Sequence, residues 1–162
     1  MPVLQGPLLD RDAWSPVGEC PIEKTMAVAG QKSAMLIMRE AYYGTTRFDD
    51  FAKRVGITKA ATSARLSELV EAGLLAKRPY REPGQRARDE YVLTQAGVDF
   101  MPVVWAMFEW GRNHLPNSGR LKLTHLECGA DAHVEIVCEE GHPVPLDELG
   151  MRLVAKALPE PA

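Results

Sequence analysis

Four glycines divide the first half of this chain into short segments that favour helices. Gly30, Gly44, Gly56 and Gly73 each follow such a segment. Glycine commonly ends a helix because it adopts the left-handed backbone conformation without steric cost. The sequence therefore predicts helices from Pro21 to Gly30, over residues 32–43 and 48–55, and from residue 58 to Gly73.

The order of the next elements predicts the fold. Gly56 makes a tight turn and Thr58 can cap the helix that follows it, so two helices form a helix-turn-helix. Residues 74–80 and 89–94 favour strands around a long tip, residues 81–88. We expect a mainly α protein with a small β hairpin (α+β), which is the arrangement of a winged helix-turn-helix.

The charge of the chain is unevenly distributed. The net charge is −3, yet residues 24–94 hold 13 Lys and Arg against 8 Asp and Glu, and the remainder holds 6 against 14. A basic region favours a phosphate-bearing partner, although a solvated surface gives the same pattern.

Helical periodicity orients the helix that begins near Thr58. With Leu66, Leu69 and Val70 buried, the opposite face carries Ala60, Ala61 and Ala64, and its edges carry Thr58, Lys59, Ser63 and Arg65. A small, uncharged half-helix can lie deep in a DNA major groove. The alternative is that the alanines only raise helix propensity.

The predicted hairpin tip is strongly basic. In a winged helix this tip lies beside the duplex, where arginine and lysine reach phosphates or enter the minor groove. The candidate contacts are Lys77, Arg78, Arg81, Arg86 and Arg88. A solvated loop does not need five positive charges, so we expect these residues to contact DNA.

Five stretches carry a family resemblance: CPIEKTMAVAGQK, LIMRE, RFDDFAKRVGIT, ARLSELVEAGLLAKRPY and RDEYVLTQAG. In order and spacing they resemble the HxlR family of winged helix-turn-helix transcriptional regulators over about residues 20–115. The resemblance implies a homodimer, paired through its terminal helices, that binds double-stranded DNA sequence-specifically.

Three positions depart from the family pattern. Ser33 stands where family members usually carry Trp, and Ala60 and Ala64 stand where they carry Lys and Gln. The last two departures leave base reading to Lys59, Thr62, Ser63 and Arg65.

Residues 95–115 predict one further helix, in which Pro102 can introduce a kink. Its apolar stripe consists of Val98, Met101, Val104, Trp105 and Phe108. Such a stripe can be ordinary core, but a domain this small already has a core in its earlier helices. A subunit interface is the expected use.

The sequence predicts three regions: an N-terminal arm (residues 1–19), the winged helix with its dimerisation helix (20–115), and a C-terminal appendage (116–162). In the appendage, residues 121–129 and 133–142 alternate as two short strands would, and a final helix is expected over about residues 146–158.

The predicted appendage hairpin carries candidate metal ligands. His125 and Cys128 form one pair, and Cys138 and His142 form a second. A zinc ribbon uses two such pairs to supply the four ligands of a tetrahedral structural zinc ion. Gly141 stands where a second cysteine would complete the motif, so a hairpin that has lost its metal is the alternative.

Cys20 lies beside a predicted helix N-terminus, where a thiolate is favoured. Some relatives in the family that the chain resembles are thought to sense oxidants at the matching position, which makes Cys20 a candidate redox thiol. An inert, buried thiol is the alternative. The chain could thus respond to an oxidant or a small-molecule effector.

Other classes have weaker support. The sequence shows no nucleophile–base pair, acidic dyad or Gly-rich phosphate loop, so we expect no enzyme. Apolar runs such as residues 101–108 are shorter than the roughly 20 residues that span a bilayer. Three cysteines and no secretory signal favour the cytoplasm. The alternative function is a protein-interaction or thiol- or metal-sensing module with weak or no DNA binding.

Overall fold

The computed structural model describes residues 3–12, 18, 20–117 and 119–153. The chain forms two compact units: Pro21–Val134 is one, and Met1–Cys20 together with Glu135–Ala162 is the other. The proposed functional regions, residues 1–19, 20–115 and 116–162, remain a prediction.

The four helices expected from the glycines are confirmed. They are α1 (Pro21–Ala29), α2 (Lys32–Tyr42), α3 (Phe48–Val55) and α4 (Lys59–Glu71). Gly44, Gly56 and Gly73 have φ angles of 86°, 73° and 74°, the left-handed values that let each follow a helix end. The Thr58 side chain accepts a hydrogen bond of 3.2 Å from the backbone N–H of Ala61, which caps α4 as predicted.

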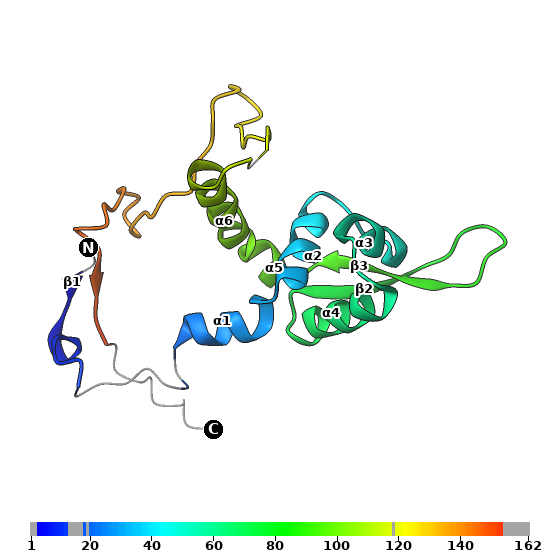
Figure 1. Cartoon of the computed structure of the whole chain (residues 1–162), viewed down its shortest axis with the longest axis horizontal. Coiled ribbons are helices and arrows are strands. Elements are labelled where there is room, and N and C mark those ends of the chain that lie inside the picture. The colour runs from blue at the N-terminus through cyan, green and yellow to red at the C-terminus, as the bar shows by residue number, and fades with distance from the viewer. Residues whose placement is uncertain (1–2, 13–17, 19, 118, 154–162) are drawn as a thin grey trace. The chain divides into compact units, whose positions relative to one another are not determined.

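The predicted wing is also present. Strands β2 (Leu75–Tyr80) and β3 (Arg88–Leu93) are antiparallel, with Leu75 opposite Leu93 and Tyr80 opposite Arg88. β2 contacts α4 and β3 contacts α2, while the connecting tip projects away from these helices (Figure 1). The unit is therefore a winged helix-turn-helix, and the α+β fold class is confirmed.

One apolar cluster holds the helices and the wing together. The buried side chains come from α2, α3, α4, β2 and α6 (Met101–His114), and include Ile37, Met38, Phe51, Leu66, Leu69 and Leu75. Burying each large side chain stabilises the fold by about 1.5–3 kcal/mol. Because Leu66 and Leu69 face inward, the opposite side of α4 is left toward solvent.

The helix predicted over residues 95–115 is divided in two. α5 (Gln95–Asp99) and α6 (Met101–His114) meet at Phe100, so the prediction of one continuous helix is wrong. Pro102 has no N–H to donate back into α5. The N–H of Val103 instead bonds to the Phe100 carbonyl at 3.1 Å, a tighter turn that starts the new helix.

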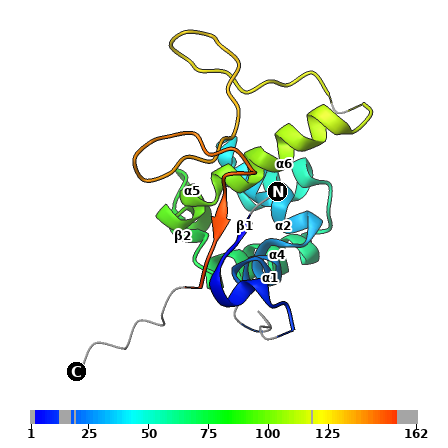
Figure 2. The same cartoon turned by 90° about the vertical axis from the view of Figure 1, so that its left-hand side faces the viewer.

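In the second unit, β1 (Val3–Leu4) pairs in parallel with β4 (Gly150–Met151), and η1 (Gly6–Leu9) follows β1 (Figure 2). Residues 146–153 do not form a helix, so the prediction of a helix over residues 146–158 is wrong for that part. Residues 154–158 lie outside the described residues. Leu146 is 62% exposed. Without packing, so short a helix is marginal in water.

The two strands expected over residues 121–129 and 133–142 are also wrong. Each segment belongs to a tight turn with a single bridge, Thr124 to Asp131 in one and Val137 to Pro143 in the other. Leu121 and Leu126 are 63% and 99% exposed, so the alternating pattern has no surface to pack against.

Gly97 in α5 offers a test of how tightly α5 packs against the wing. A Cβ at this position would overlap the backbone carbonyl oxygen of Leu74. We expect Gly97→Ala to lower the free energy of unfolding by about 1–3 kcal/mol, measured by urea titration. The control is Gly111→Ala in α6, where the nearest atom to a new Cβ lies 3.9 Å away. This control should leave the free energy of unfolding unchanged or raise it by up to about 1 kcal/mol. Equal losses of stability in the two variants would contradict tight packing at Gly97.

Candidate nucleic-acid interface

The outer face of α4 is small and uncharged. Ala60, Ala61 and Ala64 are exposed, as the predicted rotation requires, and Ser63 lies exposed beside them. Thr58 is exposed, and its hydroxyl oxygen accepts the helix-cap hydrogen bond while its O–H can still donate. Beside Lys59, the N-terminal half of α4 therefore presents methyl groups and the hydroxyls of Ser63 and Thr58.

The prediction that Thr62 contacts bases is wrong. Its side chain is fully buried, and its hydroxyl donates a 2.9 Å hydrogen bond to the backbone carbonyl of Thr58. Thr62, Leu66 and Leu69 follow the i, i+4, i+7 spacing of one helix face, and this signal in the sequence could have identified the burial.

The two cations at the edges of α4 are both ion-paired. Lys59 Nζ lies 2.7 Å from Asp49 Oδ1 on α3, and Arg65 pairs with Glu68 one turn further along α4. The hydrogen bond from Lys59, followed by its charge, holds the pKa of Asp49 below its ordinary value. Exposed pairs of this kind are weak, so phosphate could still compete for either cation.

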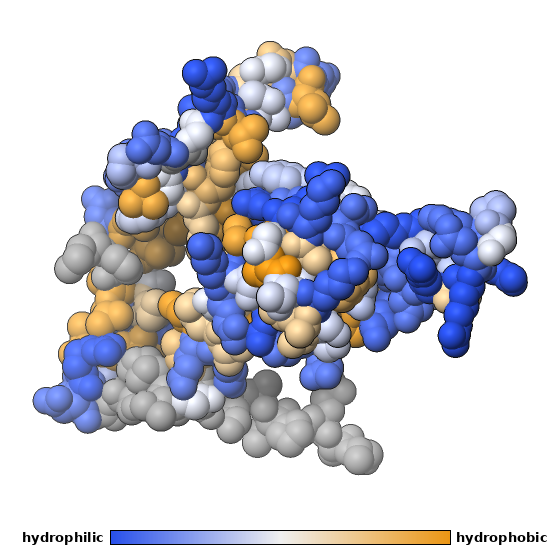
Figure 3. Space-filling model, turned by 45° about the vertical axis from the view of Figure 1, so that its right-hand side comes forward, coloured by the Kyte–Doolittle hydropathy of each residue, from blue (hydrophilic) through white to orange (hydrophobic). Residues whose placement is uncertain are grey.

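The wing carries the candidate phosphate contacts. Lys77, Arg81, Arg86 and Arg88 are all exposed, and the projecting hairpin is hydrophilic over the surface seen in Figure 3. Arg81 Nε donates to the backbone carbonyl of Gln85 at 3.1 Å, within the tip itself. In the described part of the chain, Lys77 and Arg86 have no ion-pair partner.

Arg78 is placed differently from the other wing cations. Its Nε donates to Glu90 Oε1 at 2.7 Å, across the β2–β3 ladder. Glu90 is only 8% exposed. The hydrogen bond from Arg78 is the main reason why the pKa of Glu90 lies below its ordinary value, and burial opposes the shift.

Glu90 also faces the segment before α3. Arg47 Nη1 lies 3.7 Å from Glu90 Oε2, beyond hydrogen-bond distance, so this contact is electrostatic. The Arg47 guanidinium also stacks 3.1 Å from the centre of the Tyr80 ring. Sequence reasoning missed Arg47 and Glu90, because neither lies in a motif and their pairing exists only in the fold.

The predicted interface helix contributes partly to the subunit's own core. Val104 belongs to the buried cluster, so its assignment to a subunit interface is wrong. The Trp105 ring lies 6.1 Å from those of Tyr42 and Tyr43 and 6.0 Å from Phe108, while Met101 is half-buried. Val98 is exposed, as are four apolar residues that the prediction omitted: Val103, Met107, Trp110 and Leu115.

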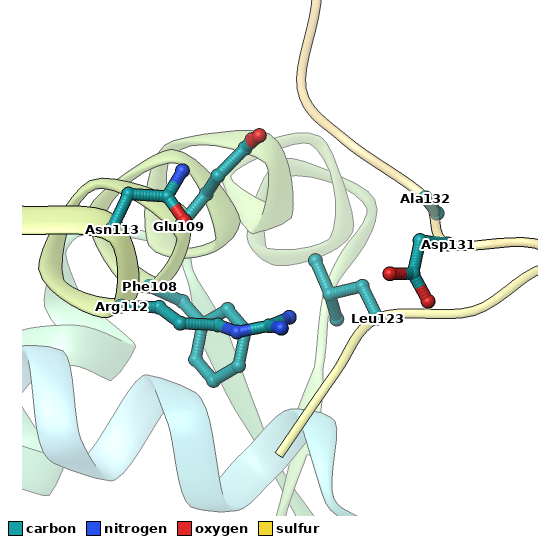
Figure 4. A pocket seen from close by; sticks show the side chains of 7 residues that line it. All are labelled: Phe108, Glu109, Arg112, Asn113, Leu123, Asp131 and Ala132. Atoms are coloured by element: carbon teal, nitrogen blue, oxygen red, sulfur yellow. The ribbon is translucent and has the colours of Figure 1, made fainter. Parts of the chain in front are cut away.

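A polar pocket lies between the end of α6 and the segment that follows it (Figure 4). The backbone N–H of Val134 donates to Glu109 at 2.8 Å, and Lys122 pairs with Asp131 at 2.7 Å. The hydrogen bond from Lys122 is the main reason why the pKa of Asp131 lies below its ordinary value. The contact from Val134 joins the segment to α6, and the Lys122 pair lies within the segment, so Glu109 and Asp131 both make structural contacts.

The candidate metal ligands fall in both units. His125 Nδ1 lies 3.1 Å from Cys128 Sγ within Pro21–Val134, whereas Cys138 and His142 belong to the other unit. Among the described residues, no group of three or more His, Cys, Asp or Glu side chains could hold a metal ion. A structural zinc ion therefore stays a prediction.

Cys20 is a half-buried free thiol directly before α1. Redox sensing through Cys20 also stays a prediction.

Over the residues that the structure describes, none of the helices has the length and apolar character needed to cross a membrane.

The sequence model of the HxlR-like helix-turn-helix family matches residues 28–119. Among curated proteins, the chain is 34% identical over 119 residues to the HTH-type transcriptional regulator Rv3095 of Mycobacterium tuberculosis, covering 72% of this chain and 74% of that protein. It is 32% identical over 104 residues to an HTH-type transcriptional regulator of Methanothermobacter thermautotrophicus, covering 62% and 78%.

Solved structures show the same similarity. The crystal structure of PA1607, described as a candidate transcription factor, superposes with a TM-score of 0.72 at 28% identity, covering 87% of this chain and 98% of that one. The reduced form of the redox regulator HypR superposes with a TM-score of 0.54 at 28% identity, covering 60% and 95%.

Replacing Glu90 should loosen the base of the wing in a pH-dependent manner. We expect Glu90→Gln to lower the free energy of unfolding at neutral pH, because the amide oxygen that replaces the carboxylate accepts from Arg78 without a charge. Since the folded-state pKa of Glu90 is lowered, its contribution is complete above the ordinary value of 4.5 and is lost as pH falls through the folded-state pKa. In urea titrations from pH 7 to pH 3, the free energies of unfolding of the wild type and of Glu90→Gln should converge as the pH falls. The control is Asp89→Asn, at an exposed neighbouring position. A difference in free energy between wild type and Glu90→Gln that does not depend on pH would contradict this role of Glu90.

Proposed function

Because the chain belongs to the HxlR-like helix-turn-helix family, we propose that it is a cytoplasmic homodimer that binds double-stranded DNA sequence-specifically and thereby regulates transcription. The observation that carries this proposal is a basic, exposed wing beside an exposed and uncharged half of α4. The fold is that of transcription regulators, and the chain's charges are arranged as a duplex requires.

Phosphate contacts supply most of the affinity in such a complex. The side chains of the wing cations Lys77, Arg86 and Arg88 form no hydrogen bond or ion pair within the part of the chain that is described, and the charge of Arg88 also lowers the pKa of Asp49. We infer that these cations are available to phosphate oxygens. The wing supports binding to any duplex, because phosphates carry no sequence information of their own. Sequence discrimination would then come from α4.

A dimer is supported by apolar surface that the subunit leaves exposed. On α6, Met107 and Trp110 are 54% and 59% exposed, and on α1, Ile22 and Met26 are 73% and 54% exposed. Large apolar side chains gathered on two helices favour an interface between subunits. A two-fold dimer would place two copies of α4 on two half-sites about one helical turn apart, or a multiple of it.

The wing can be tested by its effect on salt dependence. We expect the double variant Arg86→Ala/Arg88→Ala to bind specific and random duplexes more weakly, and to lower the slope of log affinity against log salt by about one to two units per half-site. Fluorescence anisotropy at several salt concentrations measures both. The matched control, Lys24→Ala/Lys32→Ala, removes the same charge from α1 and α2 and should keep the slope. If the wing variant keeps the wild-type slope of log affinity against log salt, these arginines do not contact DNA phosphates.

The dimer can be tested at α6. Each chain has a mass of 17.9 kDa, and light scattering should give twice this value for the wild type. Met107→Asp should yield monomers, because a charge buried in an apolar interface lacks a partner. Leu126→Asp, at a position 99% exposed on a turn, should remain dimeric. A monomeric wild type at micromolar concentration that still binds DNA tightly would refute the homodimer.

A further inference from the structure

Tyr42, the last residue of α2, contacts both of the helices that meet at Phe100. Its hydroxyl donates a 2.6 Å hydrogen bond to the backbone carbonyl of Gly97 in α5. The centre of its ring lies 6.1 Å from that of Trp105 in α6. Burial raises the pKa of the hydroxyl to about 12, so the group is protonated and able to donate at neutral pH. Tyr42 therefore joins α2 to both sides of the break.

The first of these helices, α5, is fixed to the junction between α4 and the wing. A Cβ at Gly97 would overlap the backbone carbonyl oxygen of Leu74, so the two backbones are in close contact. The Thr94 hydroxyl accepts a 3.1 Å hydrogen bond from the backbone N–H of Gly97 and donates to the Gly73 carbonyl. Gly73 and Leu74 connect α4 to β2, so α5 moves with the elements that would contact DNA.

The second helix, α6, is placed mainly by side chains. Pro102 has no N–H to donate back across the break into α5. Val104 lies in the buried cluster, and Trp105 packs beside the Tyr42 ring. The later turns of α6 carry the exposed apolar side chains of the proposed dimer. The angle between α5 and α6 therefore depends on the packing around Tyr42.

We propose that Tyr42 is a positioning residue that fixes the separation of the two DNA half-sites. This inference rests on the proposed function, because paired half-sites require a dimer that binds DNA. With α6 joining the subunits, its angle to α5 sets the distance and the rotation between the two copies of α4. Tyr42 holds this angle, since its hydroxyl contacts α5 and its ring contacts α6.

The geometry of DNA makes such positioning measurable. Moving a half-site by one base pair shifts it by about 3.4 Å and turns it by about 35°. To follow an altered separation, α6 must change its angle in each subunit, which in the wild type strains the hydrogen bond from Tyr42 to Gly97. Without that bond, the affinity for an altered separation should rise relative to the native one by about two- to tenfold for each subunit.

Tyr42→Phe tests the inference, because it removes the hydroxyl and keeps the ring. The matched control is Tyr43→Phe. The Tyr43 ring also lies 6.1 Å from that of Trp105, but Tyr43 is 50% exposed, and in the described part of the chain its hydroxyl has no hydrogen-bond partner. Half-sites are taken from a genomic fragment that the purified protein retains. Affinities are measured for one isolated half-site and for operators whose half-sites are moved by one or two base pairs in either direction.

We expect Tyr42→Phe to bind the isolated half-site with wild-type affinity, because α4 and the wing are unchanged. Its preference for the native separation should fall by about two- to tenfold for each subunit, whereas Tyr43→Phe should keep the wild-type preference. Thermal unfolding checks that both variants are folded.

An unchanged preference for the native separation in Tyr42→Phe would overturn the inference. An equal loss of affinity for the half-site and for every operator would also overturn it, because Tyr42 would then only stabilise the fold. If the wild type binds no genomic fragment better than random DNA, or binds DNA as a monomer, the proposed function itself fails, and the inference fails with it.

Discussion

The buried carboxylate of Glu90 fixes the wing to the helix-turn-helix. It accepts a hydrogen bond from Arg78 across the hairpin and faces Arg47, which directly precedes α3. Beside it, the backbone N–H of Tyr91 donates to the Thr46 carbonyl at 2.8 Å, so β3 is also bonded to that segment. The base of the wing is thereby held relative to α3 and α4, whereas the tip carries cations without such contacts. A fixed base and a free tip suit a surface that must hold register on a duplex and still adjust to its phosphates.

The sequence was most informative where one residue determines the local backbone. Gly44, Gly56 and Gly73 adopt left-handed angles that other residues resist, and the helix ends predicted from them agree with the structure to within about two residues. Pro102 predicted a kink, but the structure has a break at Phe100. The lack of one N–H weakens a helix locally, and the packing on both sides decides whether it bends or restarts.

The sequence was least informative where structure depends on burial. Residues 121–129 and 133–142 have the alternation of strands, but strand propensity largely expresses how a side chain fits a half-buried surface. Leu121 and Leu126 find no such surface, and the chain forms tight turns with single bridges instead. The same cause affects Leu146, where a helix was expected. Apolar periodicity predicts a secondary-structure element only when another element is available to cover it.

For the candidate interface, counting charged residues overestimates the charge that is available to a ligand. The wing contains the predicted cations, but Arg78 serves the Glu90 contact, and Lys59 and Arg65 on α4 are engaged by Asp49 and Glu68. These partners come from other strands, from other helices or from the next helical turn, so the pairing follows from the fold and not from composition. What the fold leaves exposed is a basic tip and an α4 face of alanine methyl groups with the Ser63 hydroxyl beside them. Phosphate contacts attract any duplex and carry no sequence information of their own, so discrimination between sequences would have to come from the side chains on this face of α4.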